Sequence, residues 1–386
     1  MKSLFSNLLF KVFLAIVFGI IFGLYLPESV NRVFATFNSL FSQFLNFAIP
    51  LIIMGLIMPA ISDLGKGAGK LLVLTTAIAY GSTLFSGFMT YFTTSGIFSS
   101  LLASHVDKTA QIAETAKELL PYFTITIPAV LDIMTALVFA FVIGLGLAYQ
   151  ENSSLKLVVK DFQLIIMQLI ENVIVPLLPL FILGIFANMT FSGKVYSILS
   201  VFVNIIGVIF VLHILLLLLQ YTVTGILVKK NPLRLLATMM PAYFTALGTQ
   251  SSAATIPVTL NQTLKNGVSE KIAGFVIPLC ATIHLSGSVM KITACAIAIM
   301  ILEGMPFDFT LFAGFILMLG IAMVAAPGVP GGAIMAAIGI LQSMLGFNEE
   351  MIGLMIALYI AMDSFGTACN VTGDGAIALV VNKITK

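Results

Sequence analysis

The chain has 386 residues, of which 60% are hydrophobic and 9% are charged, and its mean hydropathy is +1.12. These values lie far outside the range of soluble domains, and the net charge of +2 gives no indication of a nucleic-acid partner. Apolar runs long enough to cross about 30 Å of hydrocarbon recur along the whole chain, and strand-like alternation is absent. We therefore predict an all-α membrane protein with several transmembrane helices, surrounded by membrane lipids.

The apolar runs predict the following elements in chain order. Helices are expected at 8–26, 33–61, 69–99, 122–149, 162–191 and 196–228, an irregular region at 232–262, a helix at 269–303, a second irregular region at 311–345 and a last helix at 350–382. Lys2 and Lys11 precede the first run as they would in a signal peptide. No small-residue cleavage site follows that run, so we expect a retained first helix.

The positions of the basic residues predict the topology. With the N-terminus in the cytoplasm, thirteen lysines and arginines lie inside and four outside, provided that 232–262 and 311–345 each enter and leave on the same side. The sequence thus predicts eight transmembrane helices, two re-entrant helical hairpins, and both termini in the cytoplasm. The expected location is the plasma membrane, as the inner membrane of a bacterium.

Both predicted hairpins contain a break of small residues and proline, GTQSSAATIPVT at 248–259 and AAPGVPGGA at 325–333. Each is followed by a helix that we expect to be interrupted, at 286–288 and within 366–375. Backbone groups released by such breaks are tolerated at membrane depth only beside protein or a water-filled cavity. Two hairpin-plus-broken-helix units, entered from opposite sides, indicate a transporter of inverted repeats with its site near the middle of the membrane.

The last helix carries the densest polar cluster of the chain. Its members are Asp363, Thr367, Asn370, Thr372 and Asp374. All but Thr372 follow one another at intervals of four, three and four residues, which places them on one helix face. Each carboxylate costs about 2.5–3.5 kcal/mol on insertion scales, so we interpret the pair as functional rather than as acids satisfied by hydrogen bonds or by water at the helix end. Carboxylate and amide oxygens suit an alkali cation, and a second carboxylate suits a positively charged substrate group.

Four motifs occur in a familiar order: SSAATIPVT, PLCATIHLSGS, GVPG and NVTGD. In this order they resemble the dicarboxylate/amino acid:cation symporter family, which includes the glutamate transporters, and the resemblance covers essentially the whole chain. It implies an elevator-type secondary active transporter that assembles as a homotrimer. The scaffold is then expected in 1–68 and 101–195, which includes an external loop, and the transport domain in 69–100 and 196–386.

The resemblance also implies a substrate site. Its expected residues are Asp363, Thr367, Asn370, Ser251, Ser252, Gly366, Gly328 and Val329. Asp363 matches the acid that binds the substrate ammonium, and Thr367 assists it. Asn370 matches the amide that holds the α-carboxylate, together with backbone groups of the first hairpin.

Two departures from the family bear on the substrate. Members for acidic substrates carry an arginine at the position of Gly366, and some members carry one at Gln250. Without a counter-cation, a second substrate carboxylate is left unpaired in a low-dielectric pocket. We therefore expect a small neutral amino acid, such as alanine, serine or threonine. An acidic amino acid or dicarboxylate stays an alternative, because the sequence does not place Lys291 relative to the pocket.

The resemblance further implies that sodium drives the transport. The expected ion ligands are Asn370, Asp374, Cys280, His284, Thr282 and Ala326, with carbonyl groups at several of them. At one sodium site the family's aspartate is replaced by Ser286, and Thr83 is expected to line that altered site.

Two basic residues, His284 and Lys291, lie close to Ser286 in the sequence. His284 is either a neutral, hydrogen-bonded histidine or a carrier of a proton in place of sodium. The Lys291 ammonium either replaces the missing cation or pairs with a buried acid. A proton-coupled or mixed-coupling carrier is therefore an alternative, and a channel is a more distant one. A hydrolytic triad of Ser251, His284 and Asp363 has no support from sequence spacing, so we do not expect an enzyme.

Overall fold

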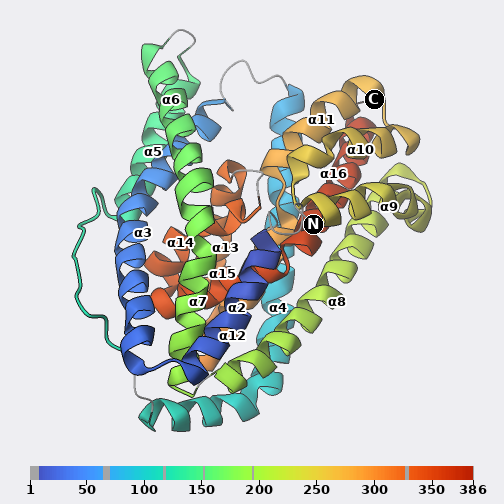
Figure 1. The fold of residues 1–386 in the computed structure, drawn as a ribbon. Coiled ribbons are helices and arrows are strands. Elements are labelled where there is room, and N and C mark those ends of the chain that lie inside the picture. The colour runs from blue at the N-terminus through green and yellow to red at the C-terminus, as the bar shows by residue number, and fades with distance from the viewer. Residues whose placement is uncertain are drawn as a thin grey trace.

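The computed structural model describes residues 8–63, 70–115, 119–150, 153–193, 195–326 and 330–385. Regular secondary structure in these ranges is all helical, as predicted (Figure 1). Six stretches within them are long and apolar enough to cross a membrane: Leu8–Tyr25, Glu28–Ser62, Lys70–Leu102, Ser154–Phe191, Val201–Val228 and Glu270–Leu302. The pair Glu349–Ala361 and Asp363–Ile384, bent by 61°, makes a seventh if it is one span. The chain is a multi-pass helical membrane protein, and the count of eight crossings stays a prediction.

One group of helices forms the left side of the molecule in Figure 1. It consists of α2 (Leu8–Tyr25), α3 (Glu28–Asp63), α5 (Ile133–Ala148), α6 (Ser154–Leu169), the π-helix η1 (Ile170–Ile174) and α7 (Val175–Phe191). Within the group α2 packs on α7, and α3 packs on α5, α6 and α7. The glycines of α2 allow this approach, since a Cβ at Gly19 or Gly23 would overlap the α7 backbone.

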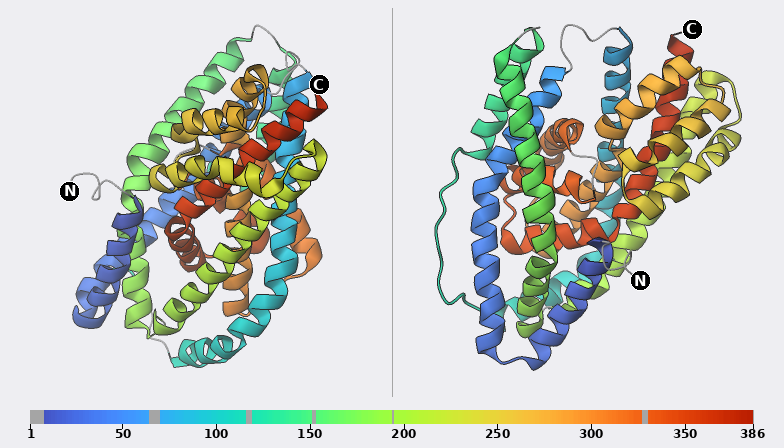
Figure 2. Two further views of the ribbon diagram at one scale, coloured as in Figure 1. Left: turned by 90° about the vertical axis from the view of Figure 1, so that its right-hand side faces the viewer. Right: turned by 45° about the horizontal axis from the view of Figure 1, so that its top comes forward.

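The remaining helices form a second group and a layer between the two. The second group consists of α4 (Lys70–Thr115), α8 (Val195–Val228), α9 (Pro232–Thr249), α10 (Ser252–Lys265), α11 (Glu270–Ile283), α12 (Ser286–Leu302) and α16 (Asp363–Ile384). In it, α12 packs on α4, and α16 packs on α8, α9, α10 and α11. The layer consists of α13 (Phe309–Ala325), α14 (Gly332–Leu345) and α15 (Glu349–Ala361) (Figures 1 and 2). These helices also contact the first group: α13 contacts α3, α14 contacts α3 and α5, and α15 contacts α2 and α7.

Both predicted hairpins are present as helix pairs. The pair α9–α10 turns at Gln250, whose backbone is left-handed with φ of +54°. Two hydrogen bonds hold its open end together: Lys230 Nζ donates to the Asn266 carbonyl (2.7 Å), and Asn266 Nδ2 donates to the Leu235 carbonyl (3.0 Å). The pair α13–α14 turns in a segment of which 327–329 lie outside the described residues. The open end of the first hairpin lies beside the carboxyl end of α16, where the amide of Ser269, just after α10, donates to Asn382 Oδ1 (3.2 Å). The second hairpin leads directly into the start of α15. The two hairpins therefore reach the bend between α15 and α16 from opposite ends of that pair.

The predicted helix at 122–149 is helical only in its second half. Residues 119–132 are extended instead and run alongside α3 (Figure 1). Backbone amides in this segment bond to α3 side chains, from Tyr122 to Thr36 Oγ1 (2.9 Å) and from Ile127 to Gln43 Oε1 (3.3 Å). Pro128 and the β-branched run before it disfavour a helix here, and α3 supplies partners for the backbone groups that a helix would have satisfied.

Three helix limits differ from the prediction. The helix expected to end at 99 continues to Thr115, and the helix expected from 162 begins at Ser154. The last helix was predicted to break within 366–375, but it is continuous there and bends at Met362. The glycines of that segment serve close packing instead: a Cβ at Gly373 would overlap His284 and Gln220, and one at Gly375 would overlap Met239.

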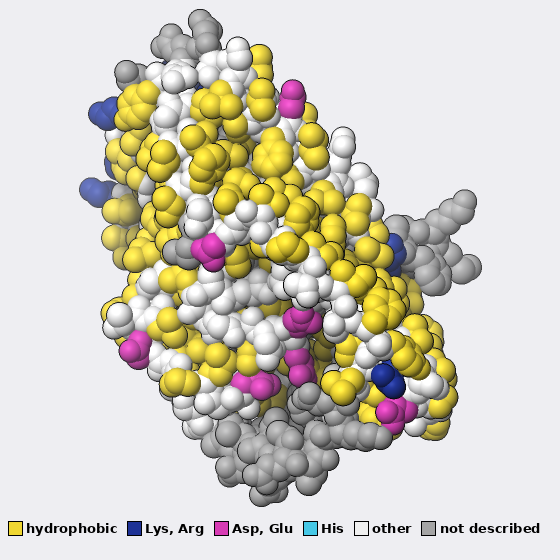
Figure 3. All heavy atoms as spheres, turned by 90° about the vertical axis from the view of Figure 1, so that its left-hand side faces the viewer, with side chains coloured by type: hydrophobic (Ala, Val, Ile, Leu, Met, Phe, Trp, Pro, Cys, Tyr) yellow, Lys and Arg dark blue, Asp and Glu magenta, His cyan; other side chains and the backbone are white. Residues whose placement is uncertain are grey.

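Hydrophobic side chains predominate on the face shown in Figure 3, where charged side chains are few. Large apolar residues are exposed on both helix groups, among them Phe13, Val142, Leu157, Val203 and Ile226. Such a surface suits a hydrocarbon solvent, in which exposed apolar side chains carry no cost.

Candidate functional site

The two hairpin tips meet at the first residues of α16. In the first hairpin, Gln250 Nε2 donates to Ser364 Oγ (2.9 Å). In the second, the backbone amide of Gly331 donates to Asp363 Oδ2 (2.9 Å). The helix α12 begins at Ser286 and packs on α16, so four separate segments converge around Asp363. The polar residues singled out from the sequence are thereby gathered into one buried cluster.

A buried ion pair occupies the centre of this cluster. The Lys291 ammonium lies 3.0 Å from Asp363 Oδ1, and the Lys291 side chain is fully buried while that of Asp363 is 7% exposed. Lys291 Nζ also lies 3.4 Å from the Met362 carbonyl and 3.6 Å from the centre of the Tyr359 ring. Both oxygens of Asp363 therefore have a donor, because Oδ1 accepts from Lys291 and Oδ2 from Gly331. Such pairing offsets the cost of burying the two charges.

Gly366 makes room for the lysine. A Cβ at this position would overlap the end of the Lys291 side chain, at Cε and Nζ. The sequence raised Gly366 as the place where an arginine is missing, and the structure puts the ammonium of another helix directly beside it. The position of Lys291 relative to the cluster, which the sequence left open, is therefore at its centre.

A second buried pair lies further along α16. His284 Nδ1 lies 2.8 Å from Asp374 Oδ1, with both side chains at most 1% exposed. The other ring nitrogen, Nε2, lies 3.1 Å from Ser82 Oγ on α4. His284 occupies the break between α11 and α12, so the interruption of this helix places an imidazole against the acid. Each of the two buried acids of α16 is thus paired with a basic side chain from the Cys280–Lys291 stretch.

Asn370 lies on α16 between the two acids and bonds to the start of α12. Its Oδ1 accepts from the Gly287 amide (2.7 Å) and its Nδ2 donates to Ser288 Oγ (3.2 Å). The Ser288 hydroxyl also accepts from Tyr359 (3.1 Å), which lies against Lys291. The amide of Asn370 therefore holds the start of α12 against α16.

The other predicted site residues lie at varying distances from this cluster. Ser251 caps α10 by accepting from the Ala254 amide (3.3 Å). Ser252, Thr367, Cys280, Ser286, Ala326 and Thr83 are buried. Thr282 is exposed, and its hydroxyl donates to the Leu279 carbonyl of its own helix (2.8 Å). Gly328 and Val329 lie outside the described residues.

Several residues of the cluster were not predicted from the sequence. Gln220 on α8 donates to Ser82 Oγ (3.0 Å) and Ser286 Oγ (3.3 Å), and Ser86 on α4 donates to the Ser286 carbonyl (2.6 Å). His213 on α8 is buried and lies 3.3 Å from the Gly287 carbonyl. A glutamine or histidine within an apolar helix was the available signal, since such groups need a partner at that depth.

Comparison with known proteins decides the family. The sodium:dicarboxylate symporter family matches residues 8–384. The chain belongs to this family. Like the symporters it resembles, it is a membrane transporter and not an enzyme, as predicted.

Individual relatives of this symporter-family chain differ in coverage. The serine/threonine transporter SstT of Acinetobacter baumannii is 26% identical over 383 residues, which cover 95% of this chain and 94% of that protein. Human excitatory amino acid transporter 2 is 33% identical over 183 residues, and mouse excitatory amino acid transporter 3 is 34% identical over 162. These two matches cover 47% and 42% of this chain, and each spans 31% of the length of the longer relative.

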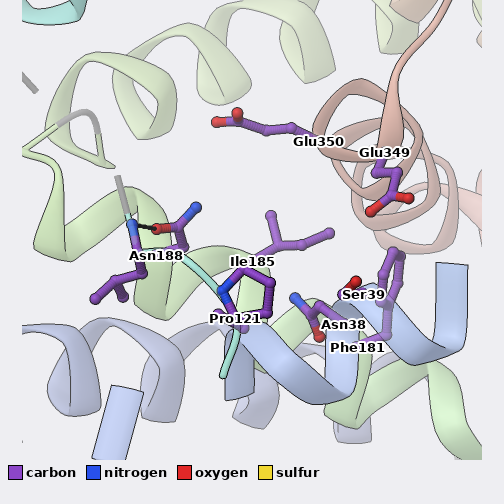
Figure 4. A pocket seen from close by; sticks show the side chains of 10 residues that line it. Asn38, Ser39, Pro121, Phe181, Ile185, Asn188, Glu349 and Glu350 are labelled. Atoms are coloured by element: carbon purple, nitrogen blue, oxygen red, sulfur yellow. Dashed lines mark hydrogen bonds between the residues drawn. The ribbon is translucent and has the colours of Figure 1, made fainter. Parts of the chain in front are cut away.

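Two cavities of this symporter-family chain lie outside the cluster. One, of about 320 Å³, is an apolar groove between α4, α8 and α16 whose lining includes Ser82, Gln220 and Gly373, so it reaches the neighbours of His284. The other, of about 230 Å³, lies between α3, α7 and the start of α15. Figure 4 shows its polar lining, with Glu349 and Glu350 on one side and Asn38 and Asn188 on the other. No predicted site residue lines this second cavity.

Proposed function

We propose that this protein is a secondary active symporter of small neutral amino acids, of the alanine, serine and threonine class, driven by a sodium gradient. One observation carries the proposal: the tips of both hairpins bond to the first turn of α16, around the buried acid Asp363. An acid enclosed by two movable tips can bind an ammonium group and be uncovered from either side, as alternating access requires.

The charges around Asp363 favour a zwitterionic substrate. The charges of Lys291 and Asp363 sum to zero, so a substrate with one ammonium and one carboxylate adds no net charge to this pair. The close approach of the Lys291 side chain to Gly366 and to the ring of Tyr359 suits a small substrate side chain. The name of the relative SstT, a serine/threonine transporter, supports the same class.

An acidic amino acid or dicarboxylate is the second candidate. It is favoured by the Lys291 ammonium, which lies beside Gly366 where acidic-substrate members are expected to carry an arginine. The names of the excitatory amino acid transporters and of the family agree with this class. Against it stands the pairing of Lys291 with Asp363, which leaves less positive charge for a second carboxylate than a free arginine would.

For the driving ion, we propose a sodium site at Asp374 and Asn370, to which the carbonyls at Cys280 and His284 contribute. The residues fit such an ion in type, since carboxylate, amide and carbonyl oxygens are hard ligands. His284 lies on the same acid at 2.8 Å, so either the ion binds at the remaining oxygens or the imidazole moves aside. Replacement of sodium by a proton at His284 is the alternative for this step. Thr83 on α4 and Ser286 on α12, the residues of the altered family site, are both buried. The ligand roles of Thr282 and Ala326 stay expectations from the resemblance.

The larger movement is proposed to be an elevator. The group formed by α2, α3, α5, α6 and α7, whose helices lie within 1–68 and 101–195, is then the scaffold. The group of α4 and α8 to α16 is the transport domain. A homotrimer in the plasma membrane, with both termini in the cytoplasm, completes the proposal.

A competition experiment tests the substrate class. Purified protein in liposomes is given labelled alanine or serine together with excess unlabelled threonine, aspartate or succinate. The proposal expects threonine to reduce the labelled uptake strongly and the two acids to leave it unchanged. Strong competition by aspartate or succinate contradicts the neutral class and supports the second candidate.

A further inference from the structure

Lys291 holds the position at which the proposed function requires a substrate ammonium. Its Nζ is an alkyl ammonium 3.0 Å from Asp363 Oδ1, and it belongs to the protein itself. The other oxygen of Asp363 accepts from Gly331 at the tip of the second hairpin (2.9 Å). An arriving ammonium therefore meets an acid whose two oxygens both already have a donor, and the ammonium of Lys291 holds the position beside Oδ1 that the substrate ammonium would take.

The surroundings make the lysine the group that can move. The Gly331 amide can leave Asp363 only if the backbone of the hairpin tip moves with it, whereas Lys291 is joined to its helix by a flexible four-carbon stem. The end of the stem lies directly against Gly366, where the lack of a side chain lets it reach Asp363. The face of the Tyr359 ring, 3.6 Å from Nζ, offers a second favourable contact for a displaced ammonium.

The charges balance in both arrangements. When Lys291 pairs with Asp363, the cluster has no unpaired charge and the second hairpin can lie closed on Asp363. When a zwitterion binds, its ammonium pairs with Asp363 and its carboxylate faces the released Lys291 ammonium. Positive and negative groups then alternate, and no charge is buried without a partner.

We propose that Lys291 is a tethered ammonium that exchanges with the substrate ammonium on Asp363. It neutralises the acid while the unloaded carrier returns across the membrane, and it selects substrates that bring both an ammonium and a carboxylate. This inference rests on the proposed function, since it requires an amino-acid substrate. It assigns to Lys291 a role that a structural ion pair does not have, because a structural pair stays closed when substrate binds.

Comparison of two transport modes tests the proposal. Net uptake requires the unloaded carrier to return, whereas exchange of labelled external alanine for internal alanine does not. In Lys291→Met, Asp363 lacks its partner on the return step, so we expect the ratio of exchange to net uptake at saturating alanine to rise by more than about tenfold. The control is Lys271→Met, in which an exposed lysine of α11 is replaced and the ratio is expected to stay at the wild-type value.

The outcomes separate the two levels of inference. If wild-type liposomes exchange alanine and Lys291→Met shows the wild-type ratio, whether both modes fall together or neither falls, the role of Lys291 is wrong and the proposed function stands. If wild-type liposomes neither exchange nor accumulate any of alanine, serine and threonine, the proposed function is wrong and the role of Lys291 falls with it.

A structure of the wild-type protein with bound alanine gives a second test, which does not depend on the folding of a variant. The proposal expects the alanine nitrogen to lie within hydrogen-bond distance of Asp363 and Lys291 Nζ to lie outside hydrogen-bond distance of Asp363. If Lys291 Nζ stays within about 3.2 Å of Asp363 while alanine is bound, the proposal is overturned.

Discussion

Lys291 Nζ and Asp363 Oδ1 lie 3.0 Å apart, although 72 residues separate them in the chain. Their pairing brings the middle of the seventh predicted helix to the bend of the last one, and the tip of the second hairpin closes on the same acid. The contact explains two departures of the sequence together, since the glycine at 366 is the space that the lysine at 291 fills.

Gly366→Ala is expected to disturb this pair. Its Cβ would overlap the end of the Lys291 side chain, so the lysine must shift and the Asp363 contact weakens. Overpacking of this kind costs about 1–3 kcal/mol, which should lower the midpoint of thermal unfolding in detergent and reduce alanine uptake. The control is Gly274→Ala, where the added Cβ has open space. Equal behaviour of the two variants would show that Gly366 does not accommodate Lys291.

Asp374→Asn is expected to remove the dependence of uptake on sodium. The substitution keeps the shape of the side chain but takes away the charge that the proposed ion site relies on. Initial uptake rates are measured against sodium concentration in liposomes at a fixed alanine concentration. A sodium response like that of the wild type would refute the site at Asp374 and Asn370.

His284 and Asp374 are expected to be energetically coupled. A double-mutant cycle of His284→Ala and Asp374→Asn, followed by thermal unfolding, should give a coupling free energy of about 1–3 kcal/mol, because the 2.8 Å contact is buried. A second cycle pairs His284→Ala with Asp308→Asn. Asp308 caps α13 through the Leu311 amide, away from His284, so this cycle should be additive. Additivity in both cycles would show that the contact contributes nothing measurable.

Two glycines of the second hairpin separate strain from function. Gly331 at the tip and Gly346 at the open end both have left-handed backbones, with φ of +75° and +70°. Alanine at either position should cost about 1–2 kcal/mol in stability. Only Gly331→Ala should also lower alanine uptake beyond what lost protein explains, since a backbone shift at 331 would move the amide that bonds to Asp363. Proportional losses of uptake and stability in both variants would argue against a gating role for the tip.

The sequence was sufficient to predict the helices, both hairpins and the shared face of Asp363, Asn370 and Asp374, because these depend on apolar length, on prolines and small residues, and on helical periodicity. The bend at Met362 could not be predicted in this way. Methionine carries no breaking signal, and the nearby glycines, which suggested a break, serve close packing. The extended segment at 119–132 was missed because its partners lie on α3, far away in the chain.

The pairing inside the cluster was also beyond the sequence. Helical spacing placed the two acids of α16 on one face, and the polar residues of 280–291 were visible as an anomaly. Which base faces which acid depends on how α12 packs against α16, and that packing is set by contacts such as Gly287 with Asn370. The contacts of Ser82 and Gln220 with this cluster likewise depend on how α4 and α8 pack against it.

The central claim is that a sodium gradient drives the concentrative uptake of a small neutral amino acid. The most direct measurement uses liposomes that contain the purified protein and are filled with sodium-free buffer. Labelled alanine and sodium are then added outside, with equal pH on both sides. The account predicts transient accumulation of alanine above its external concentration, and none when sodium is equal on both sides. Accumulation that is independent of the sodium gradient, or alanine that only equilibrates under it, would contradict the account.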